Sequence, residues 1–266
     1  MTRETSLNDA LKLMERYNVR HLPVVEDEQL GGIVSDRELL ESTGWLSGQA
    51  SDSWHSSDVG DEPETIGDIM REGVMSASPE QPVDAAAVTM MSQKIGSLPI
   101  EKDGVLVGLV TETDLLQLFL KDHRRILDSG GAQLHAAQLM TSWPITAKVD
   151  MTLAQARAIL RANDVGHVPI VEDDRLIGII SDRDLRRAHG QGLRSTTPIA
   201  EVMMSSPATV TRDTTIDVAT NLILENRISA LPVIEGDDVL VGILTVEDLM
   251  DGFLDELEDE QGTDST

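Results

Sequence analysis

The chain has 266 residues, of which 40% are hydrophobic and 26% charged, so its composition is that of a globular protein with room for one large or two modest domains. It contains no cysteine, which excludes disulfides, zinc–thiolate sites, iron–sulfur clusters and a cysteine nucleophile. The 47 acidic residues against 21 basic ones give a net charge of -26, and so acidic a surface disfavours nucleic acid and anionic membranes as partners.

The longest apolar runs are only a few residues long, too short for a membrane span of about 20 residues. Met1 is followed by polar residues rather than by the apolar core of a secretory signal, so we expect a soluble, cytoplasmic protein. An acid-rich, lysine-poor surface suits high salt, where screening removes self-repulsion. An acidic cytosolic protein with high arginine usage is the alternative, and the composition leaves both open.

One sequence pattern recurs four times along the chain. Each copy has an apolar residue followed by proline and Val or Ile, then a polar turn, then glycine, two apolar residues and Ser or Thr. The prolines are Pro23, Pro99, Pro169 and Pro232. The hydroxyl residue follows the proline by 12, 12, 12 and 13 positions, so we treat the four copies as internal repeats of one structural unit.

Each repeat predicts a helix, a hairpin and a second helix. Apolar residues recur three and four positions apart upstream of each proline, as at Ala10 and Met14, which predicts an amphipathic helix with one buried stripe. After the proline, two β-branched runs flank a short polar turn such as 26–28, which predicts a hairpin. A second helix is expected after the hydroxyl residue.

A short strand is expected before the first helix of three repeats. These leading strands lie at 74–77, 144–147 and 208–210, whereas the first repeat has only residues 1–4 in this place. The leading strand of the first repeat is therefore truncated or absent.

The segments outside the repeats have a different composition. Residues 47–64 are rich in Ser, Asp and Gly and predict a flexible connection, while the run 119–135 starts helical and breaks at 129–131, the expected boundary between two halves. The acidic stretch after Phe253 is expected to fray into solvent. The expected units are four repeats at 1–45, 66–120, 138–190 and 199–252, a linker at 121–137 and an acidic tail at 253–266.

The end of each hairpin carries Ser or Thr followed three residues later by a carboxylate. The four pairs are Ser35/Glu38, Thr111/Asp114, Ser181/Asp184 and Thr245/Asp248. Structurally, such a pair is a capping box that satisfies the first N–H groups of a helix. The same geometry suits a nucleotide, because the helix N-terminus attracts phosphate, the hydroxyl can donate to it, and the carboxylate can accept from both ribose hydroxyls. The two interpretations are compatible.

The complete pattern of leading strand, amphipathic helix, apolar-Pro-Val/Ile, hairpin and Gly-apolar-apolar-Ser/Thr-x-x-Asp/Glu resembles the CBS domain, named from cystathionine β-synthase. The resemblance covers nearly the whole chain and recurs four times. It implies a mixed α/β (α+β) fold of four βαββα repeats in two pseudo-twofold tandem pairs, the first repeat with the second and the third with the fourth. It also implies that pairs associate into a flat disc, either within one chain or in a homodimer.

The resemblance also implies a ligand. CBS pairs commonly bind adenosine-type molecules (AMP, ADP, ATP or S-adenosylmethionine), with the hydroxyl and carboxylate of the motif in the roles above and the base held between the leading strand and the backbone around the proline. The expected ligand residues are Thr146, His167, Val168, Pro169, Ser181, Arg183 and Asp184 in the third repeat, Thr111 and Asp114 in the second, and Thr209, Thr245 and Asp248 in the fourth. Ser35, Arg37 and Glu38 of the first repeat are weaker candidates.

The third repeat is the most promising site, because Arg183 precedes its carboxylate and can neutralise phosphate charge. The second and fourth repeats lack this arginine and carry Glu112 and Glu247 within the motif. Those carboxylates oppose a polyphosphate and favour a less charged ligand, or one bridged by Mg²⁺. The first repeat has Arg37, but it has Glu38 in place of Asp and lacks most of its leading strand.

No catalytic set is visible in the sequence. The histidines lack metal-site spacing, the acidic turns lack the calcium-loop register, and neither a P-loop nor a nucleophile elbow is present. We therefore expect a non-enzymatic regulatory protein without a metal or a required cofactor, which senses cellular energy through adenine nucleotides and signals to a regulated protein that the sequence does not identify. The alternative is a ligand-free scaffold that mediates dimerisation or protein–protein interaction.

Overall fold

The computed structural model describes residues 1–17, 19–42, 63–128, 130 and 132–263. Within these ranges, the side chains at 37, 40, 41 and 258–263 are not described. The predicted connection at 47–64 falls almost entirely outside the described residues, as do positions 129 and 131 of the predicted break.

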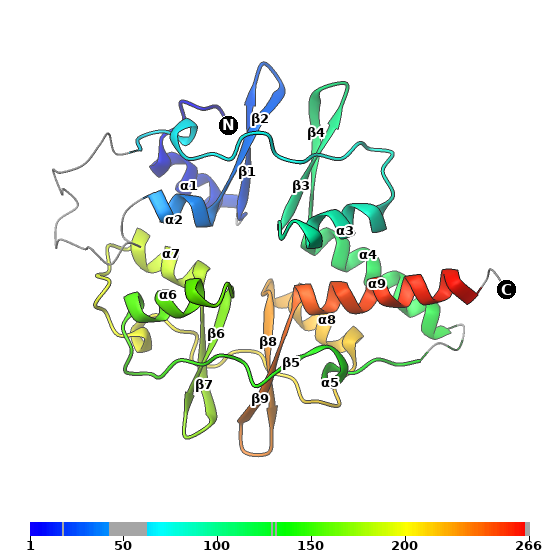
Figure 1. Cartoon of the computed structure of the whole chain (residues 1–266). Coiled ribbons are helices and arrows are strands. Elements are labelled where there is room, and N and C mark those ends of the chain that lie inside the picture. Colours follow the sequence, from blue (N-terminus) through cyan, green and yellow to red (C-terminus); the bar gives the residue numbers. More distant parts are fainter. Residues whose placement is uncertain (18, 43–62, 129, 131, 264–266) are drawn as a thin grey trace.

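Each repeat has the predicted succession of helix, hairpin and helix (Figure 1). The first repeat comprises α1 (Leu7–Tyr17), β1 (His21–Glu26), β2 (Gln29–Ser35) and α2 (Asp36–Ser42). The second comprises α3 (Val83–Ser92), β3 (Ser97–Lys102), β4 (Val105–Thr111) and α4 (Glu112–Asp128). The third comprises α6 (Leu153–Ala162), β6 (His167–Glu172), β7 (Arg175–Ser181) and α7 (Asp182–Gly190). The fourth comprises α8 (Ile216–Asn226), β8 (Ala230–Glu235), β9 (Val239–Thr245) and α9 (Val246–Thr263). Between the repeats lie η1 (Ile66–Asp68), α5 (Ala136–Leu139), β5 (Thr141–Ser142) and η2 (Ile199–Glu201).

The hairpin tips join the repeats into pairs. Gln29 of β2 pairs with Val105 of β4, and Arg175 of β7 pairs with Val239 of β9. The result is one sheet of order β1-β2-β4-β3 and a second of order β5-β9-β7-β6 with β8 on β9. The predicted pairing of the first repeat with the second, and of the third with the fourth, is therefore confirmed.

The proline of each repeat sets the hairpin register. Pro99 faces Leu109, and Pro169 faces Ile179, as do the corresponding residues of the other two hairpins. Because proline has no N–H, it and the residue opposite it form a non-hydrogen-bonded pair of the antiparallel ladder. The opposite residue therefore directs its backbone N–H and C=O away from the hairpin. Both outer edges of each hairpin are thus open to further chain segments.

One outer edge receives the end of the leading strand. Ala77, Ala147 and Val210 each donate their N–H to the carbonyl of the proline in their own repeat, at 2.9, 2.9 and 3.1 Å. In the first repeat, Met1 takes this place: its carbonyl accepts from the N–H of Val25 at 2.8 Å, and its amino group donates to the Pro23 carbonyl at 3.3 Å. The predicted leading strands therefore exist as single bridges, and that of the first repeat is reduced to Met1.

The other outer edge of three hairpins is covered by a segment that we call a strap. The straps are residues 64–71 on the first repeat, 197–204 on the third and 134–142 on the fourth. Each shares the pattern Ile/Ala-Gly/Ala-Asp/Glu/Gln-apolar-Met, as in Ile66-Gly67-Asp68-Ile69-Met70, Ile199-Ala200-Glu201-Val202-Met203 and Ala136-Ala137-Gln138-Leu139-Met140. Because every strap precedes one repeat in the chain and covers another, the straps interlock the two members of a pair.

The straps lie so close to the hairpins that only glycine fits beneath them. A Cβ atom on Gly32 would stand 2.5 Å from the carbonyl oxygen of Arg71, and one on Gly178 would stand 2.9 Å from that of Met204. On Gly108 of the second repeat, the nearest atom would be the Cβ of Ile100 at 3.8 Å, which is ordinary contact. The glycine of the repeat pattern is thus required where a strap covers it.

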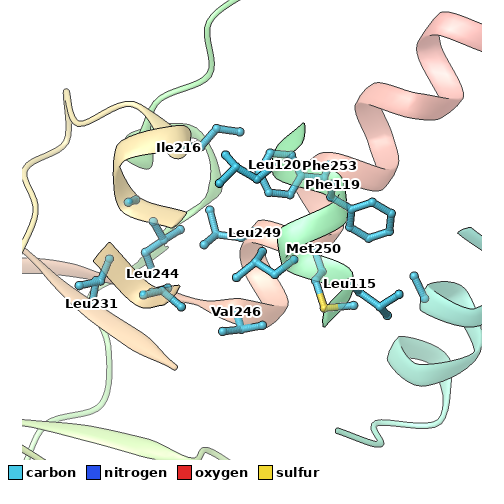
Figure 2. Packing of buried hydrophobic residues seen from close by; sticks show 14 of the residues in the cluster. Leu115, Phe119, Leu120, Ile216, Leu231, Leu244, Val246, Leu249, Met250 and Phe253 are labelled. Atoms are coloured by element: carbon cyan, nitrogen blue, oxygen red, sulfur yellow. The ribbon is translucent and has the colours of Figure 1, made fainter. Parts of the chain in front are cut away.

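The two pairs pack against each other within one chain, which is the intramolecular form of the expected disc. A single hydrophobic core spans the second and fourth repeats and includes Leu115 and Phe119 of α4 with Leu249 and Phe253 of α9 (Figure 2). On the other side of the molecule, α2 packs against α7, where Arg186 forms an ion pair with Asp36.

The acidic C-terminal segment is helical rather than frayed. α9 continues to Thr263, and the expectation of fraying is wrong for residues 253–257, because Phe253 is buried and Glu256 Oε2 lies 2.7 Å from Nδ1 of the buried His123. α4 likewise runs on to Asp128, through the first half of the predicted linker. In the described part of the chain, none of the helices has both the length and the apolar character of a membrane span.

The glycine contacts predict a position-dependent effect of one methyl group. Gly178→Ala should lower the free energy of unfolding by about 2 kcal/mol, because the added Cβ pushes the strap off β7. Gly108→Ala, the matched control, should change it by less than about 0.5 kcal/mol. Urea denaturation of both variants measures the difference, and equal losses would contradict the close approach seen at Gly178.

Candidate ligand cavity

A cavity of about 890 Å³ lies where the four repeats meet. Its walls include the N-terminal ends of α2, α7 and α9, the turns that precede β1, β3, β6 and β8, and parts of the stretches 71–75, 141–145 and 204–208. Helix N-termini carry unpaired N–H groups and the positive end of the helix dipole, so they favour an anion in the space they face.

Three of the four hydroxyl–carboxylate pairs line this cavity: Ser35/Glu38, Ser181/Asp184 and Thr245/Asp248. Each forms a capping box. Asp184 Oδ2 accepts from the Ser181 hydroxyl at 2.6 Å and from its N–H at 3.0 Å, and Asp248 Oδ2 accepts from the hydroxyl and the N–H of Thr245, both at 2.7 Å. The pair Thr111/Asp114 forms the same box, but it does not line the cavity and its carboxylate is exposed.

The third repeat holds its carboxylate and its arginine in fixed positions. Asp184 is 9% exposed, and its second oxygen, Oδ1, accepts from Arg187 at 2.9 Å. The guanidinium of Arg183 reaches the fourth repeat, where it donates to the carbonyl of Arg227 at 3.2 Å. Burial and the neighbouring cations Arg20 and Arg186 lower the pKa of Arg183, although the group remains charged at neutral pH.

A second arginine, Arg20 of the first repeat, lies near the same part of the third repeat. Burial, together with the positive charges of Arg20 and Arg183, lowers the pKa of His167 to about 4, so its imidazole is neutral at pH 7. The Nε2 atom of His167 lies 3.2 Å from the Ser229 hydroxyl. Two guanidinium groups from different repeats therefore act on one imidazole at this side of the cavity.

The walls from the second and fourth repeats are acidic. Glu112 forms an ion pair with Arg20 at 3.3 Å, yet burial raises the pKa of Glu112, with Glu247 adding to the rise. Burial and the adjacent Asp248 raise the pKa of Glu247 as well. Phosphate is therefore disfavoured beside Glu247 and favoured beside Arg183, while the charge of Arg20 is paired with that of Glu112.

The CBS domain family profile matches residues 1–43, 66–121, 136–190 and 199–255, which is most of the chain. The chain belongs to the CBS domain family. Its four repeats are thus CBS domains, and the cavity lies among all four of them.

Two solved structures share the fold over most of the chain. Protein MJ1225 of Methanocaldococcus jannaschii, described as a proposed homologue of γ-AMPK, superposes with a TM-score of 0.77 at 21% identity over 95% of both chains. A conserved protein of Pyrococcus horikoshii superposes with a TM-score of 0.63 at 19% identity, over 88% of this chain and 91% of the other. At these identities the likeness establishes the fold.

Curated relatives match over shorter stretches. The sequence is 27% identical to MJ1225 over 186 residues, which are 67% of this chain and 62% of that protein. It is 35% identical to inosine-5'-monophosphate dehydrogenase of Mycobacterium tuberculosis over 113 residues, 42% of this chain and 21% of the enzyme. The chain spans less than two thirds of the length of either relative.

Several predicted ligand residues lie away from the cavity of the CBS domains. These are Thr111, Asp114, Thr146, Val168, Pro169 and Thr209. Side chains alternate along a strand, so His167 faces the cavity while Val168 is fully buried in the core. The carbonyl of Pro169 accepts from Ala147 rather than facing the cavity. The side chain of Arg37 is outside the described residues.

Other wall residues were missed by the motif analysis. Arg20 stands three positions before its repeat proline, and Lys94, Asp164 and Arg227 each stand five positions before theirs. The last three have φ values of 51, 51 and 52°, at the left-handed turn that ends the preceding helix. Positions counted backwards from each proline would have identified them.

The lowered pKa of His167 predicts a specific pH dependence. The unfolded chain binds a proton on this residue below about pH 6.5, whereas the folded chain does so only near pH 4. Stability therefore falls as the pH drops through this window. Because His167 is half-buried, we expect wild type to lose about 1 kcal/mol more than His167→Asn between pH 7 and pH 5, measured by urea denaturation. Equal losses would show that His167 titrates normally.

Proposed function

We propose that the protein is a non-catalytic regulatory protein that binds an adenosine-type ligand in its central cavity, on the side formed by the first and third repeats. The single observation that supports this most strongly is the convergence of Ser181, Asp184, Arg183 and Arg20 on one cavity. These residues supply a helix N-terminus, a carboxylate and two guanidinium groups, the chemistry that a nucleotide requires.

Each group has a role in holding the ligand. Asp184 accepts hydrogen bonds from the ribose hydroxyls, while the Ser181 hydroxyl and the N-terminus of α7 face a phosphate. Arg183 and Arg20 neutralise the phosphate charge from two different repeats. The family resemblance supports an adenine base, and AMP, ADP, ATP and S-adenosylmethionine are the candidate ligands.

The acidic side of the cavity sets the charge of the ligand. Glu112, Glu247 and Asp248 also line the cavity, so a long polyphosphate gains less than a monophosphate unless Mg²⁺ bridges it to the carboxylates. The fourth repeat, with Thr245 and Asp248 on the cavity, is the second candidate subsite, and the first, with Ser35 and Glu38, is the third.

Regulation follows from the position of the cavity among all four repeats. A ligand that contacts Arg20 in one pair and Asp184 in the other binds best to one relative placement of the pairs, and thereby shifts the population towards it. In this proposal the protein is cytoplasmic, senses cellular energy through this shift, passes it to a regulated partner protein and forms a homodimer.

A ligand-free scaffold is the second candidate function, and one observation favours it. Both oxygens of Asp184 already have partners in the capping box and in Arg187, so the motif is satisfied as helix capping alone. In that case the hydroxyl–carboxylate pair serves the fold, and the protein acts through dimerisation or partner binding.

Calorimetric titration distinguishes the two functions. Nucleotide-stripped protein should bind one of AMP, ADP, ATP and S-adenosylmethionine with micromolar affinity in low or high salt, with and without Mg²⁺. Asp184→Ala should weaken binding at least about tenfold, because a hydrogen-bonded charged group is lost. Asp114→Ala is the matched control, since it removes the same capping box away from the cavity. Absence of heat with all four ligands would leave the scaffold as the better account.

Removal of an arginine tests the proposed direction of the phosphate. Arg183→Gln should weaken AMP about tenfold and adenosine hardly at all, because only the nucleotide has the charge that Arg183 neutralises. Arg175→Gln, an exposed arginine on the same repeat outside the cavity, is the control. An equal loss for AMP and adenosine would place the phosphate elsewhere.

A further inference from the structure

The second CBS repeat presents an uncovered face that its counterpart in the fourth repeat does not. β4 and β9 differ in sequence at only two of seven positions, VLVGLVT against VLVGILT. Nevertheless, Val107 of β4 is 55% exposed and its counterpart Val241 is 5% exposed. Val83, the first residue of α3, is 41% exposed, whereas the counterpart Ile216 is fully buried.

The difference is the strap. In the fourth repeat, strap 134–142 pairs Thr141 with Ile243, and the Leu134 carbonyl accepts from the N–H of Ile216 at 3.1 Å. In the second repeat, Leu109 stands opposite Pro99 and its backbone points outward. Among the described residues, no segment pairs with Leu109 on that outer side. We call the surface formed by Val83, Val107, Gly108, Leu109 and Leu118 the β4 face.

Two independent features fit this face to a strap. Gly108 corresponds to Gly32 and Gly178, where a Cβ atom would stand 2.5 to 2.9 Å from a strap, so that only glycine fits. At Gly108 a Cβ atom would meet only ordinary contacts, so the structure itself gives no reason for a glycine there. Furthermore, each strap methionine precedes the leading-strand residue of the next repeat by seven positions: Met70 to Ala77, Met140 to Ala147 and Met203 to Val210. In the first repeat, Met1 takes the place of the leading-strand residue. A strap whose methionine stood seven positions ahead of Met1 would therefore have the same spacing as the other three straps and would lie on β4.

We propose that the β4 face is a binding site for a fourth strap, a chain segment of the pattern Ile/Ala-Gly/Ala-Asp/Glu/Gln-apolar-Met. It adds to the edge of β4 by backbone bonds to Leu109, as edge-strand recognition does in general, and covers Val107 with its apolar side chains. Its methionine lies on Gly108. The partner that carries such a segment is thereby anchored to the second repeat.

Leu118 sets the preferred side chain before the methionine. Its counterpart in the fourth repeat is Gly252, and a Cβ there would meet the Leu139 side chain of the strap at 2.5 Å. Since Leu118 is far larger than glycine, the fourth strap should carry a smaller residue than leucine at this position.

The direct test is a labelled peptide of residues 197–206 with Val202→Ala, titrated into the full chain and followed by fluorescence anisotropy. We expect saturable binding that Gly108→Ala abolishes, because the added Cβ collides only when a strap is present. The free chain with Gly108→Ala should keep its wild-type Tm, which separates lost binding from lost folding. A peptide with Met203→Asp is the mismatched control.

Joining the strap covalently to the chain allows its binding to be detected even if the free peptide binds too weakly to measure. Fusion of residues 197–209 directly ahead of Met1 places the strap methionine seven residues before it, and should raise Tm by about 5 °C in the wild type and not in Gly108→Ala. No binding of the peptide together with no rise in Tm overturns the proposal, as does binding that Gly108→Ala leaves intact. A dimer in light scattering that Gly108→Ala dissociates would also overturn it, because a second copy would then occupy β4.

Discussion

The structure depends on one backbone constraint, the proline near the start of each hairpin. Because proline lacks an N–H, the residue opposite it turns its own N–H and C=O outward, while the proline carbonyl is free on the other edge. The leading residue, such as Ala147, bonds to that carbonyl, and a strap bonds to the facing residue, such as Ile179. Among the described residues, three of the four hairpins therefore bind both a leading residue and a strap, and the straps interlock the two members of each pair.

Much of this architecture could be predicted from the repeats, because a fixed offset from proline to hydroxyl fixes hairpin length and register. The capping boxes were also predictable, since Ser181 and Asp184 are local in sequence. The cavity was harder to predict, because it depends on how the two pairs meet: nothing local separates Thr111/Asp114, outside it, from Thr245/Asp248 on its wall. The straps were not predicted, since a short apolar-Met pattern is too common to indicate a strap until the structure shows it packed over a glycine such as Gly178.

The arrangement of charge connects the fold to the proposed function. A net charge of -26 repels anions over most of the surface, yet Arg20 and Arg183 from different repeats act on one imidazole in the cavity. An anionic ligand that enters this region reduces the repulsion between Arg20 and Arg183 beyond what the ion pair of Arg20 with Glu112 does, and so favours the packed form of the two pairs. In the same way, the hydrophobic core shared by α4 and α9 holds the second and fourth repeats together on the opposite side.

The central claim is that the ligand binds between the repeats, at the junction of the two pairs, and not on a single repeat. A crystal structure of the protein with AMP tests it most directly. The account predicts the ribose on Asp184 and the phosphate within hydrogen-bond distance of Arg183 and Arg20. A nucleotide bound at Thr111 and Asp114, or a fully ordered cavity that stays empty at saturating AMP, would contradict it.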